Sequence, residues 1–567
     1  MEAMAANKKH IIIRLVWSQI CLLLLSCTQV GAQGVDSIRV DSVGIAVDTT
    51  QVDSVTFIKT DNVDVIKAFE AKLSEATMLT INPRPLVTTP PLTRFSYDVT
   101  IIPYEIKYPD PVIKPVAMKP DPAKESDHTF IKLGYGNLKN PYARVRTTQL
   151  FSDIYLWNFS ADYSRADNSS DIAFQKHQDI RFATDIATTL METARIQVGV
   201  SGDFNNRYFY RDDINAALSE DERKRNLNRI GVTASVFNAY ENATLLDYKI
   251  DISSSLLDIN DIDQTESNSV LSVELTKQRK DNIRFTLSGD LDFNSAYEDS
   301  DLLFQVDPQV SFSSRKLLTT IGIDVINADG RTSFFPNVEL SAAIQPRRLH
   351  AYIGSEQTYR RNNLHSLVSE NNYLLSSNGL STQINRNIYG GVKGNLGHVT
   401  YDARAGYRLI DDMAIYYTAL TDSLGRFNAE TVDADAIFVE GSLAYTLENG
   451  VSIGGDLNYN VYSNTSVDDL FHIPQLMVNA FSSVSLLENK LSLRSDLHFR
   501  DAVTVSEREG TSSLSEIIDL SVEAHFYPTQ KIGVYLKGMN LLDKDNRFLQ
   551  GYQRYPLQLQ GGLIVKL

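Results

Sequence analysis

The chain ends with the stretch YPLQLQGGLIVKL, residues 555–567. From Leu557 to Leu567 every second residue is apolar or glycine, and the residues between them are largely polar. This period of two is typical of a β-strand with one apolar and one polar face. The apolar face must lie against a protein core or against the hydrocarbon of a bilayer, and the rest of the chain decides between the two.

The same alternation recurs from Thr129 onward. In residues 282–293, for example, the apolar Phe285, Leu287 and Leu291 alternate with charged or hydroxylated residues. The alternating runs persist for about ten to fifteen residues, whereas strands of soluble sandwiches average about five or six and a tilted transmembrane strand needs about nine to eleven. Their length therefore favours lipid as the environment of the apolar face.

The alternating segments predict an all-β fold, a transmembrane antiparallel β-barrel of about 22 strands. They lie at 129–136, 142–151, 154–166, 177–190, 194–210, 225–239, 245–258, 266–278, 282–295, 301–315, 317–328, 332–346, 349–359, 380–396, 399–410, 429–447, 451–462, 469–487, 490–503, 512–528, 532–543 and 555–567. An even number places both ends of such a barrel on the same side of the membrane.

The connections between these segments alternate in length, as they do in outer-membrane barrels with short periplasmic turns and longer external loops. Short links occur at 191–193, 314–317, 345–348, 396–398, 447–450, 487–490 and 527–531. Longer polar links occur at 211–225, 360–379, 410–428 and 543–554.

Residues 1–32 are predicted to be a signal peptide, with a basic start, an apolar run and a small-residue exit before cleavage near Ala32. Cleavage there removes both cysteines, Cys21 and Cys27. The alternative is a lipoprotein in which Cys27 is acylated and becomes the first residue. Both alternatives export the protein, and with the strands they predict the outer membrane of a Gram-negative cell. The net charge of −16 argues against a nucleic-acid partner.

Residues 33–128 have a different character and form a proline-rich N-terminal segment before the barrel at 129–567. Ten of the 17 prolines fall between Pro83 and Pro122, a density that favours an extended chain. An open barrel of this width would leak, and this segment is the only candidate within the chain to fill it. It is expected either to enter the lumen as a reduced plug or to serve as a periplasmic tether.

The last two predicted strands, GVYLKGMNLLDKDNRFLQGYQRYPLQLQGGLIVKL, resemble the C-terminal end of TonB-dependent receptor barrels, in a plug-poor, Bacteroidota-like form. The residues that carry the resemblance are Asn540, Leu541, Asp543, Tyr552, Pro556, Gly562, Leu563 and Leu567. The match departs from the family pattern at the end, where Leu567 replaces the usual terminal aromatic, and in the N-terminal segment, which is short for a plug domain.

The polar parity of the strands predicts the lining of the lumen. The predicted lining residues are Arg284, Asp290, Asp292, Arg494, Asp496, His498, Arg500, Asp519, Glu523 and His525. No motif of a catalytic, cofactor-binding or metal site stands out, so an enzyme is not expected. The acidic run 258–266 lacks the turn glycine of a calcium loop, because Asp263 takes that position, and it is interpreted as a solvated loop.

The resemblance implies a barrel that moves a solute or ligand across the outer membrane. Expected partners are outer-membrane lipid, the barrel insertion machinery and a periplasmic energy-coupling or scaffold protein. The weak plug keeps a second function open, a non-transporting barrel that acts as a scaffold in a secretion or envelope-assembly complex.

Overall fold

The computed structural model describes residues 128–567, apart from 152–153, 191–193, 212–217, 239–245, 280–281, 297–298, 347, 377–379, 420–421, 448–449 and 507–509. These residues belong to one compact unit, Asp127–Leu567. The predicted signal peptide, Cys27 and all but the last residue of the predicted segment 33–128 lie outside the described residues.

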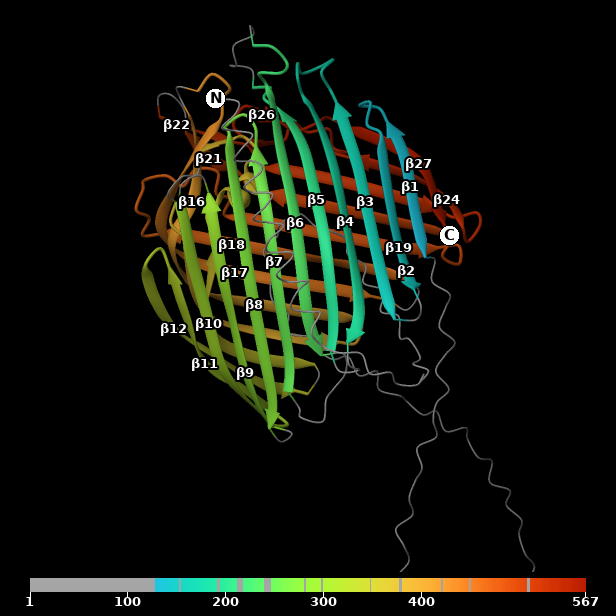
Figure 1. Cartoon of the computed structure of the whole chain (residues 1–567). Coiled ribbons are helices and arrows are strands. Elements are labelled where there is room, and N and C mark those ends of the chain that lie inside the picture. The colour runs from blue at the N-terminus through green and yellow to red at the C-terminus, as the bar shows by residue number, and fades with distance from the viewer. Residues whose placement is uncertain are drawn as a thin grey trace, which may run out of the picture. The chain divides into compact units, whose positions relative to one another are not determined.

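Long antiparallel strands form a closed ring (Figure 1). Its first part consists of β1 (Thr129–Gly136), β2 (Tyr142–Phe151), β3 (Tyr155–Asp167), β4 (Lys176–Leu190), β5 (Ala194–Tyr208), β6 (Lys224–Asn238), β7 (Leu246–Ile259), β8 (Gln264–Arg279), β9 (Ile283–Ala296), β10 (Asp299–Ser313), β11 (Leu317–Ala328), β12 (Arg331–Gln345) and β13 (Leu349–Arg360). Its second part consists of β15 (Gln383–Leu396), β16 (Val399–Thr418), β17 (Phe427–Thr446), β18 (Val451–Ser463), β19 (Leu476–Leu486), β20 (Leu491–Arg500), β23 (Ile517–Phe526), β24 (Ile532–Met539) and β27 (Gln558–Lys566). Each strand pairs with its neighbours in the chain, and β1 pairs with both β2 and β27. The described residues thus form the predicted barrel, with 22 strands in the ring.

The first and last strands of the ring are joined edge to edge. Thr129 and Leu567 exchange two backbone hydrogen bonds, of 2.9 and 2.8 Å, so both ends of the barrel lie at the same end of the ring. Gly562 of the predicted C-terminal signature is needed at this seam, because a Cβ atom there would lie 1.9 Å from the carbonyl oxygen of Leu133. Closure without a free edge leaves no row of unpaired backbone groups facing the lipid.

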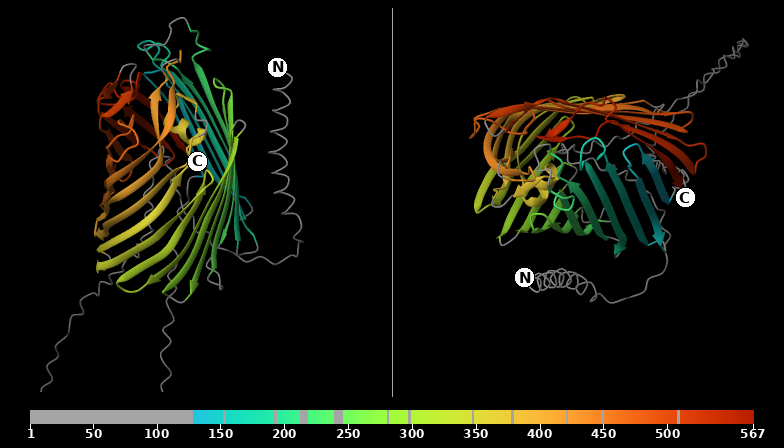
Figure 2. Two further views of the ribbon diagram at one scale, coloured as in Figure 1. Left: turned by 90° about the vertical axis from the view of Figure 1, so that its left-hand side faces the viewer. Right: turned by 90° about the horizontal axis from the view of Figure 1, so that it is seen from above.

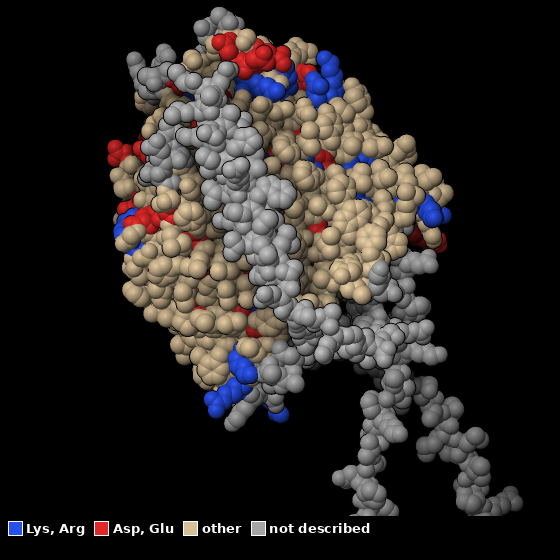
Figure 3. Space-filling view, in the orientation of Figure 1, with Lys and Arg blue, Asp and Glu red and all other residues tan. Residues whose placement is uncertain are grey.

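The alternate apolar residues of the strands form the exposed outer face. On β27 and directly after it, Leu559, Leu563 and Leu567 are 45%, 56% and 59% exposed, whereas Gln560 is buried. On β9, Phe285 and Leu291 are likewise exposed while Asp292 is buried. In Figure 3 the visible surface over the strands is mostly uncharged. Hydrocarbon, rather than a protein core, is therefore the partner of the apolar face.

The connections alternate between the two ends of the ring as predicted. The short links around 314–317, 396–398, 487–490 and 527–531 all lie at the end that holds Thr129 and Leu567, and the longer loops lie at the other end. This second end is called the long-loop end below. The predicted short link 191–193 falls outside the described residues. Within the part of the chain that the structure describes, no helix has the length and hydropathy to span a bilayer.

The longest predicted loops are more ordered than expected. The prediction of a loop over 410–428 is wrong, because β16 and β17 continue to Thr418 and from Phe427. The inner face of this extension is apolar, and the connection 464–475 covers it with Val467, Leu470, Phe471 and Ile473. Because this face is covered, β16 and β17 stay hydrogen-bonded to each other beyond the length that a bilayer requires.

Short elements occupy the other long connections. The predicted loop 360–379 contains the helix α2 (Leu364–Glu370) and β14 (Leu374–Ser376), which pairs in parallel with β17. The predicted strand 512–528 starts only at Ile517, because β21 (Val503–Ser506) and β22 (Thr511–Leu514) form a separate hairpin. A second small hairpin joins β25 (Arg547–Leu549) and β26 (Tyr552–Gln553). The strands expected from 469 and 555 begin at Leu476 and Gln558.

Candidate functional site: the loop core and the polar inner face

A hydrophobic cluster fills part of the long-loop end, and we call it the loop core. Its buried members are Phe209, Leu227, Leu257, Ile259, Leu364, Leu367, Val368, Leu374, Ala414, Tyr416, Phe427 and Tyr552. These residues belong to connections and strand ends that are far apart around the ring, from β5 and β6 to β16, β17 and β26. Such segments meet only if they fold inward over the mouth, and Figure 2 (right) shows the single described helix, α2, inside the ring.

α2 is held by its own sequence and by the barrel wall. The side chain of Asn363 accepts a hydrogen bond from the Ser366 amide and caps the helix. The carboxylate of Glu266 on β8 accepts hydrogen bonds from the amides of Leu364 and His365, at 2.7 and 3.0 Å. Leu364, Leu367 and Val368 share one helix face, and this face is buried in the loop core.

Three tyrosines join the loops at the centre of the loop core. The rings of Tyr373 and Tyr552 stack with centroids 3.7 Å apart and planes within 11°. Tyr210 packs edge-on against Tyr552 at 5.1 Å and donates a hydrogen bond to the carbonyl of Gln553. Burial raises the pKa of the Tyr373 and Tyr552 phenols well above the ordinary value, so both stay neutral at physiological pH.

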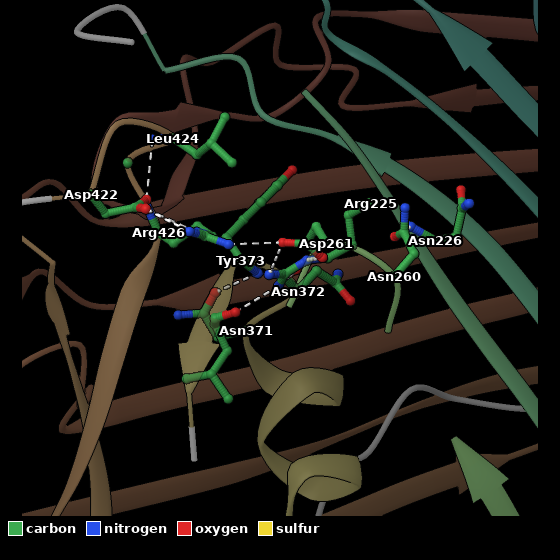
Figure 4. Close-up of polar contacts among 12 residues, drawn as sticks. Arg225, Asn226, Asn260, Asp261, Asn371, Asn372, Tyr373, Asp422, Leu424 and Arg426 are labelled. Atoms are coloured by element: carbon green, nitrogen blue, oxygen red, sulfur yellow. Dashed lines mark hydrogen bonds and ion pairs between the residues drawn. The ribbon is translucent and has the colours of Figure 1, made fainter. Parts of the chain in front are cut away.

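A buried ion-pair network lies beside Tyr373 (Figure 4). Both carboxylate oxygens of Asp261 accept hydrogen bonds of 2.6 Å from Arg225, whose side chain is fully buried. Arg225 also donates to the carbonyls of Asn372 and Leu374, at 2.9 and 2.7 Å. The connections that follow β7 and β13 are thereby fixed to the end of β6.

Arg426 extends this network to the connection between β16 and β17. It lies 3.1 Å from the Asp261 carboxylate and 2.6 Å from that of Asp422. Burial alone would raise the pKa of Asp422, but the hydrogen bonds from Arg426 outweigh it and lower the pKa. The interpretation of 258–266 as a solvated loop is therefore wrong for Asp261, because its carboxylate is needed to neutralise two arginines.

The predicted lining residues of β23 are brought together with β1. The carboxylate of Glu523 contacts both Lys132 and His525, and the Lys132 ammonium lies 3.5 Å from His525 Nε2. Lys132 also lies over the ring of Tyr535 at 4.0 Å. This group spans the seam that closes the barrel, and all its members lie on the parity opposite to the exposed leucines.

The predicted residues of β20 form a second group. Arg494 and Asp496 form an exposed ion pair of 2.7 Å, and His498 lies 2.7 Å from the Asn479 side chain. Arg500 is buried at the end of the strand. Asp519 of β23 pairs with Arg554 of the last loop. These contacts agree with a shared inner face, but the role of the residues in lining a lumen stays a prediction.

The residues predicted on β9 form a third group, separate from the other two. Asp292 is buried, accepts a hydrogen bond from Asn268 at 2.7 Å and lies 3.7 Å from Arg361. Asp290 lies on the same parity, whereas the exposed Arg284 contacts Gln278 near the short-turn end. The structure thus distributes the predicted residues around the wall and does not gather them into one site.

A charged network on β16 and β17 is absent from the prediction. Glu440 accepts from Arg404 and Arg408 at 2.7 and 2.8 Å, and Arg404 also lies 3.3 Å from Glu356 on β13. Both arginines lie over the ring of Phe438. The available signal was the polar parity of β16, on which Arg404 and Arg408 are four residues apart.

The signature residues of the last two strands have structural roles. Asn540, at a positive φ of 47°, donates to the carbonyls of Lys544 and Tyr555. Asp543 accepts from the Leu557 amide at 2.9 Å, just after Pro556, and Leu541 donates to the Leu520 carbonyl. Tyr552 belongs to the loop core. The signature therefore connects the seam of the barrel to the loops that fold over its mouth.

No protein-family model matches the sequence, and no curated protein sequence matches it. Among solved structures, the siderophore receptor PirA from Acinetobacter baumannii is similar with a TM-score of 0.60 and 9% identity, over 78% of this chain and 80% of that one. The copper transporter OprC is similar with a TM-score of 0.59 and 12% identity, over 79% and 82%. The FrpB iron transporter from Neisseria meningitidis is similar with a TM-score of 0.59 and 11% identity, over 77% and 81%.

At identities this low, the structural similarity establishes a shared fold and nothing more. The agreement covers most of each chain, and the strand number, the closed ring and the apolar outer face were all expected from the alternation along the chain. The fold prediction is therefore confirmed: this chain has a closed 22-stranded antiparallel β-barrel, and its fold is that of these receptors and transporters.

Proposed function

We propose that this protein moves a solute or ligand across the outer membrane through its barrel. The observation that carries the proposal is the closed 22-stranded ring with a charged inner parity, a fold shared with proteins that are named as siderophore receptors and as copper and iron transporters. The exposed leucines of the outer face support insertion into lipid, and the barrel type supports the outer membrane as its location.

The path inside the barrel is proposed to follow the three polar groups, on β9, on β20 and at the seam. Charged side chains of both signs are solvated in a water-filled lumen, whereas their contact with lipid would cost free energy. We further propose that residues 33–128 obstruct this lumen, because a 22-stranded ring is too wide to be filled by its own side chains.

The loop core has to open for any ligand to pass. Its tyrosine stack joins the connection after β13 to the connection after β24, so separating Tyr373 from Tyr552 is a requirement of transport in this proposal. An exported chain cleaved after Ala32 has no cysteine of its own, and introduced cysteine pairs can therefore be cross-linked selectively.

The test uses planar bilayers and four proteins: the wild type, a deletion of residues 33–128, and each of these with Tyr373→Cys and Tyr552→Cys. We expect a large new conductance on deletion, and we expect a short bifunctional thiol reagent to reduce it only in the double-cysteine form. The reagent is chosen to join the two cysteines through disulfides, so reduction of these disulfides should restore the current. A deletion protein that conducts no more than the wild type would contradict the proposal of a lumenal plug, and conductance unaffected by the cross-link would contradict the proposed gate.

One observation favours the alternative scaffold function, namely the loop core itself. Buried side chains and ion pairs join connections from distant parts of the ring, as expected of a barrel whose mouth stays shut. In this case the cross-linked and wild-type proteins should support cell growth equally. The barrel should then co-purify with a periplasmic or surface partner that is lost on deletion of residues 33–128.

A further inference from the structure

The last residue of β20, Arg500, is a buried cation without a carboxylate. Its side chain is only 8% exposed, and none of the described acidic residues lies within 4.0 Å of its guanidinium. One terminal nitrogen donates to the carbonyls of Arg547 and Phe548, both at 3.3 Å, while Nε has no partner. A buried charge without a counter-ion is destabilising, so the arrangement calls for an anion.

A second guanidinium lies close by. The guanidinium carbons of Arg500 and Arg554 lie 4.8 and 4.4 Å from the centroid of the Phe548 ring. The two carbons are therefore at most about 9 Å apart. The Arg554 side chain is 43% exposed and pairs with Asp519. His498 stacks on the same ring at 6.0 Å. The cluster therefore has one enclosed and one accessible cation beside a single aromatic ring.

The other charged and titratable groups near Arg500 form no ion pair with it. His472 has its Nδ1 2.8 Å from the Tyr416 carbonyl, so Nδ1 carries the proton and Nε2 is a free, buried acceptor. Burial and the neighbouring Arg500 lower the pKa of His472 to about 4, which keeps this ring neutral. Asp501 acts on Arg500 electrostatically but forms no ion pair with it, and Asp501 Oδ1 accepts from the Gln475 amide at 3.1 Å. Asp519 is paired with Arg554, so neither carboxylate contacts the Arg500 guanidinium.

We propose that Arg500 and Arg554 form a binding site for the anionic group, carboxylate or phosphate, of a small ligand that enters from the long-loop end. A guanidinium fork suits both groups, because two parallel N–H donors match two oxygens. Arg500 lies on the parity opposite to the exposed Leu497, so the anion comes from the aqueous side and not from a lipid headgroup of the surrounding membrane.

The approach to the site is past Arg554, through the connection that carries Phe548. Arg500 is covered there by the carbonyls of Arg547 and Phe548, at distances near the long end of hydrogen bonding. An anion would replace these weak contacts by charge-assisted ones. Only the biological purpose of the site rests on the proposed function. The site can bind an anion whether or not the barrel transports it.

The test is calorimetric titration of the purified full chain in detergent, with inorganic phosphate and citrate as separate probes at constant ionic strength. We expect saturable binding of at least one probe and an increase in Kd on the order of tenfold to a hundredfold for Arg500→Gln, as for loss of hydrogen bonds to a charged group. Arg554→Gln should weaken binding by a smaller factor. Arg331→Gln, on β12 and exposed in its ion pair with Asp412, lies outside the three polar groups; it is the control and should bind as the wild type does.

Folding of each variant is checked by the shift in gel mobility on heating, and Arg500→Lys serves as a second variant that keeps the charge but loses the fork. Weakened binding by a folded Arg500→Lys supports the site. Absence of saturable binding by the wild type, or an equal loss in Arg331→Gln, overturns it. Binding without any conductance or uptake would instead contradict the proposed transport and leave the anion site intact.

Discussion

At the scale of single residues, the ion pair of Arg225 and Asp261 is the most enclosed charged contact of the loop core. Arg225 is 0% exposed and the Asp261 side chain is 8% exposed. Removing one partner of a buried pair leaves the other charge without compensation, which in other proteins costs about 3–5 kcal/mol. Opening the mouth would separate Arg225 from Asp261, and the cost of this separation is how the pair stabilises the closed state.

The first prediction is that Asp261→Asn loosens the loop core while the barrel stays intact. Hydrogen exchange in the connection around Asn372 and Leu374 should become at least tenfold faster, because Arg225 fixes their carbonyls only when its charge is balanced. Asp263→Asn, exposed in the same connection, is the control and should leave the exchange unchanged. Equal exchange in the two variants would contradict the role assigned to the ion pair.

The second prediction concerns pH and two histidines that border the loop core. The pKa values of His365 and His472 fall from 6.5 to about 4, in both cases mainly through burial, with Arg229 and Arg500 respectively adding to the effect. The folded loops therefore resist protonation. The contribution of the two neutral histidines to stability is complete above pH 6.5 and is lost as the pH falls from 6.5 toward 4.

The loop core should accordingly open more readily at pH 4.5 than at pH 7.5. Hydrogen exchange of α2, corrected for the intrinsic effect of pH, measures this opening. In the double variant His365→Gln and His472→Gln the difference between the two pH values should become smaller. A wild-type protein with equal protection at both pH values would show that neither histidine matters.

At the scale of structural elements, the seam of β24, β27 and β1 determines whether the ring closes. Gly562 has to be a glycine there because the Leu133 carbonyl occupies the space of a side chain. We predict that Gly562→Val prevents pairing of β1 with β27, so that the protein no longer runs as a compact heat-modifiable barrel on gels. Gly441→Val on β17 is the control, since its Cβ would meet only the Asp402 carbonyl at 3.7 Å. Normal heat modifiability of Gly562→Val would contradict this account of the seam.

The elements also show how far the sequence could predict the fold. Every predicted strand exists, because the period of two is a local property that each strand carries in its own residues. The extension of β16 and β17 was missed because their inner face is apolar there, which broke the expected alternation. The cover for that face, 464–475, is a separate connection that no local pattern links to the hairpin.

At the scale of the whole molecule, lipid contact is what distinguishes this barrel from a soluble sheet protein. Leu563, near the middle of β27, is 56% exposed on the outer face. We predict that Leu563→Arg destabilises the inserted barrel by about 2–4 kcal/mol, as for a charge near the bilayer midplane. On a water-exposed surface the same change would have almost no effect.

The measurement is denaturant unfolding and refolding in lipid vesicles, followed by tryptophan fluorescence. Gln558→Arg, on the same strand but on the polar parity at its end, is the control and should change the free energy of unfolding by less than about 1 kcal/mol. A neutral Leu563→Arg would exclude hydrocarbon as the environment of the outer face.

The sequence alone determined the strands, their number, the outward direction of the leucines and the polar character of the opposite face, because each follows from alternation along one segment. Only the tertiary structure decided which of the polar residues meet. Tyr210 packs edge-on against Tyr552 although they are far apart in the chain, and Arg500 lies beside Arg554 only because the last loop folds inward. Ring closure creates these neighbours, and the packing of inward-folding loops depends on the shape of the completed barrel rather than on any period in the sequence.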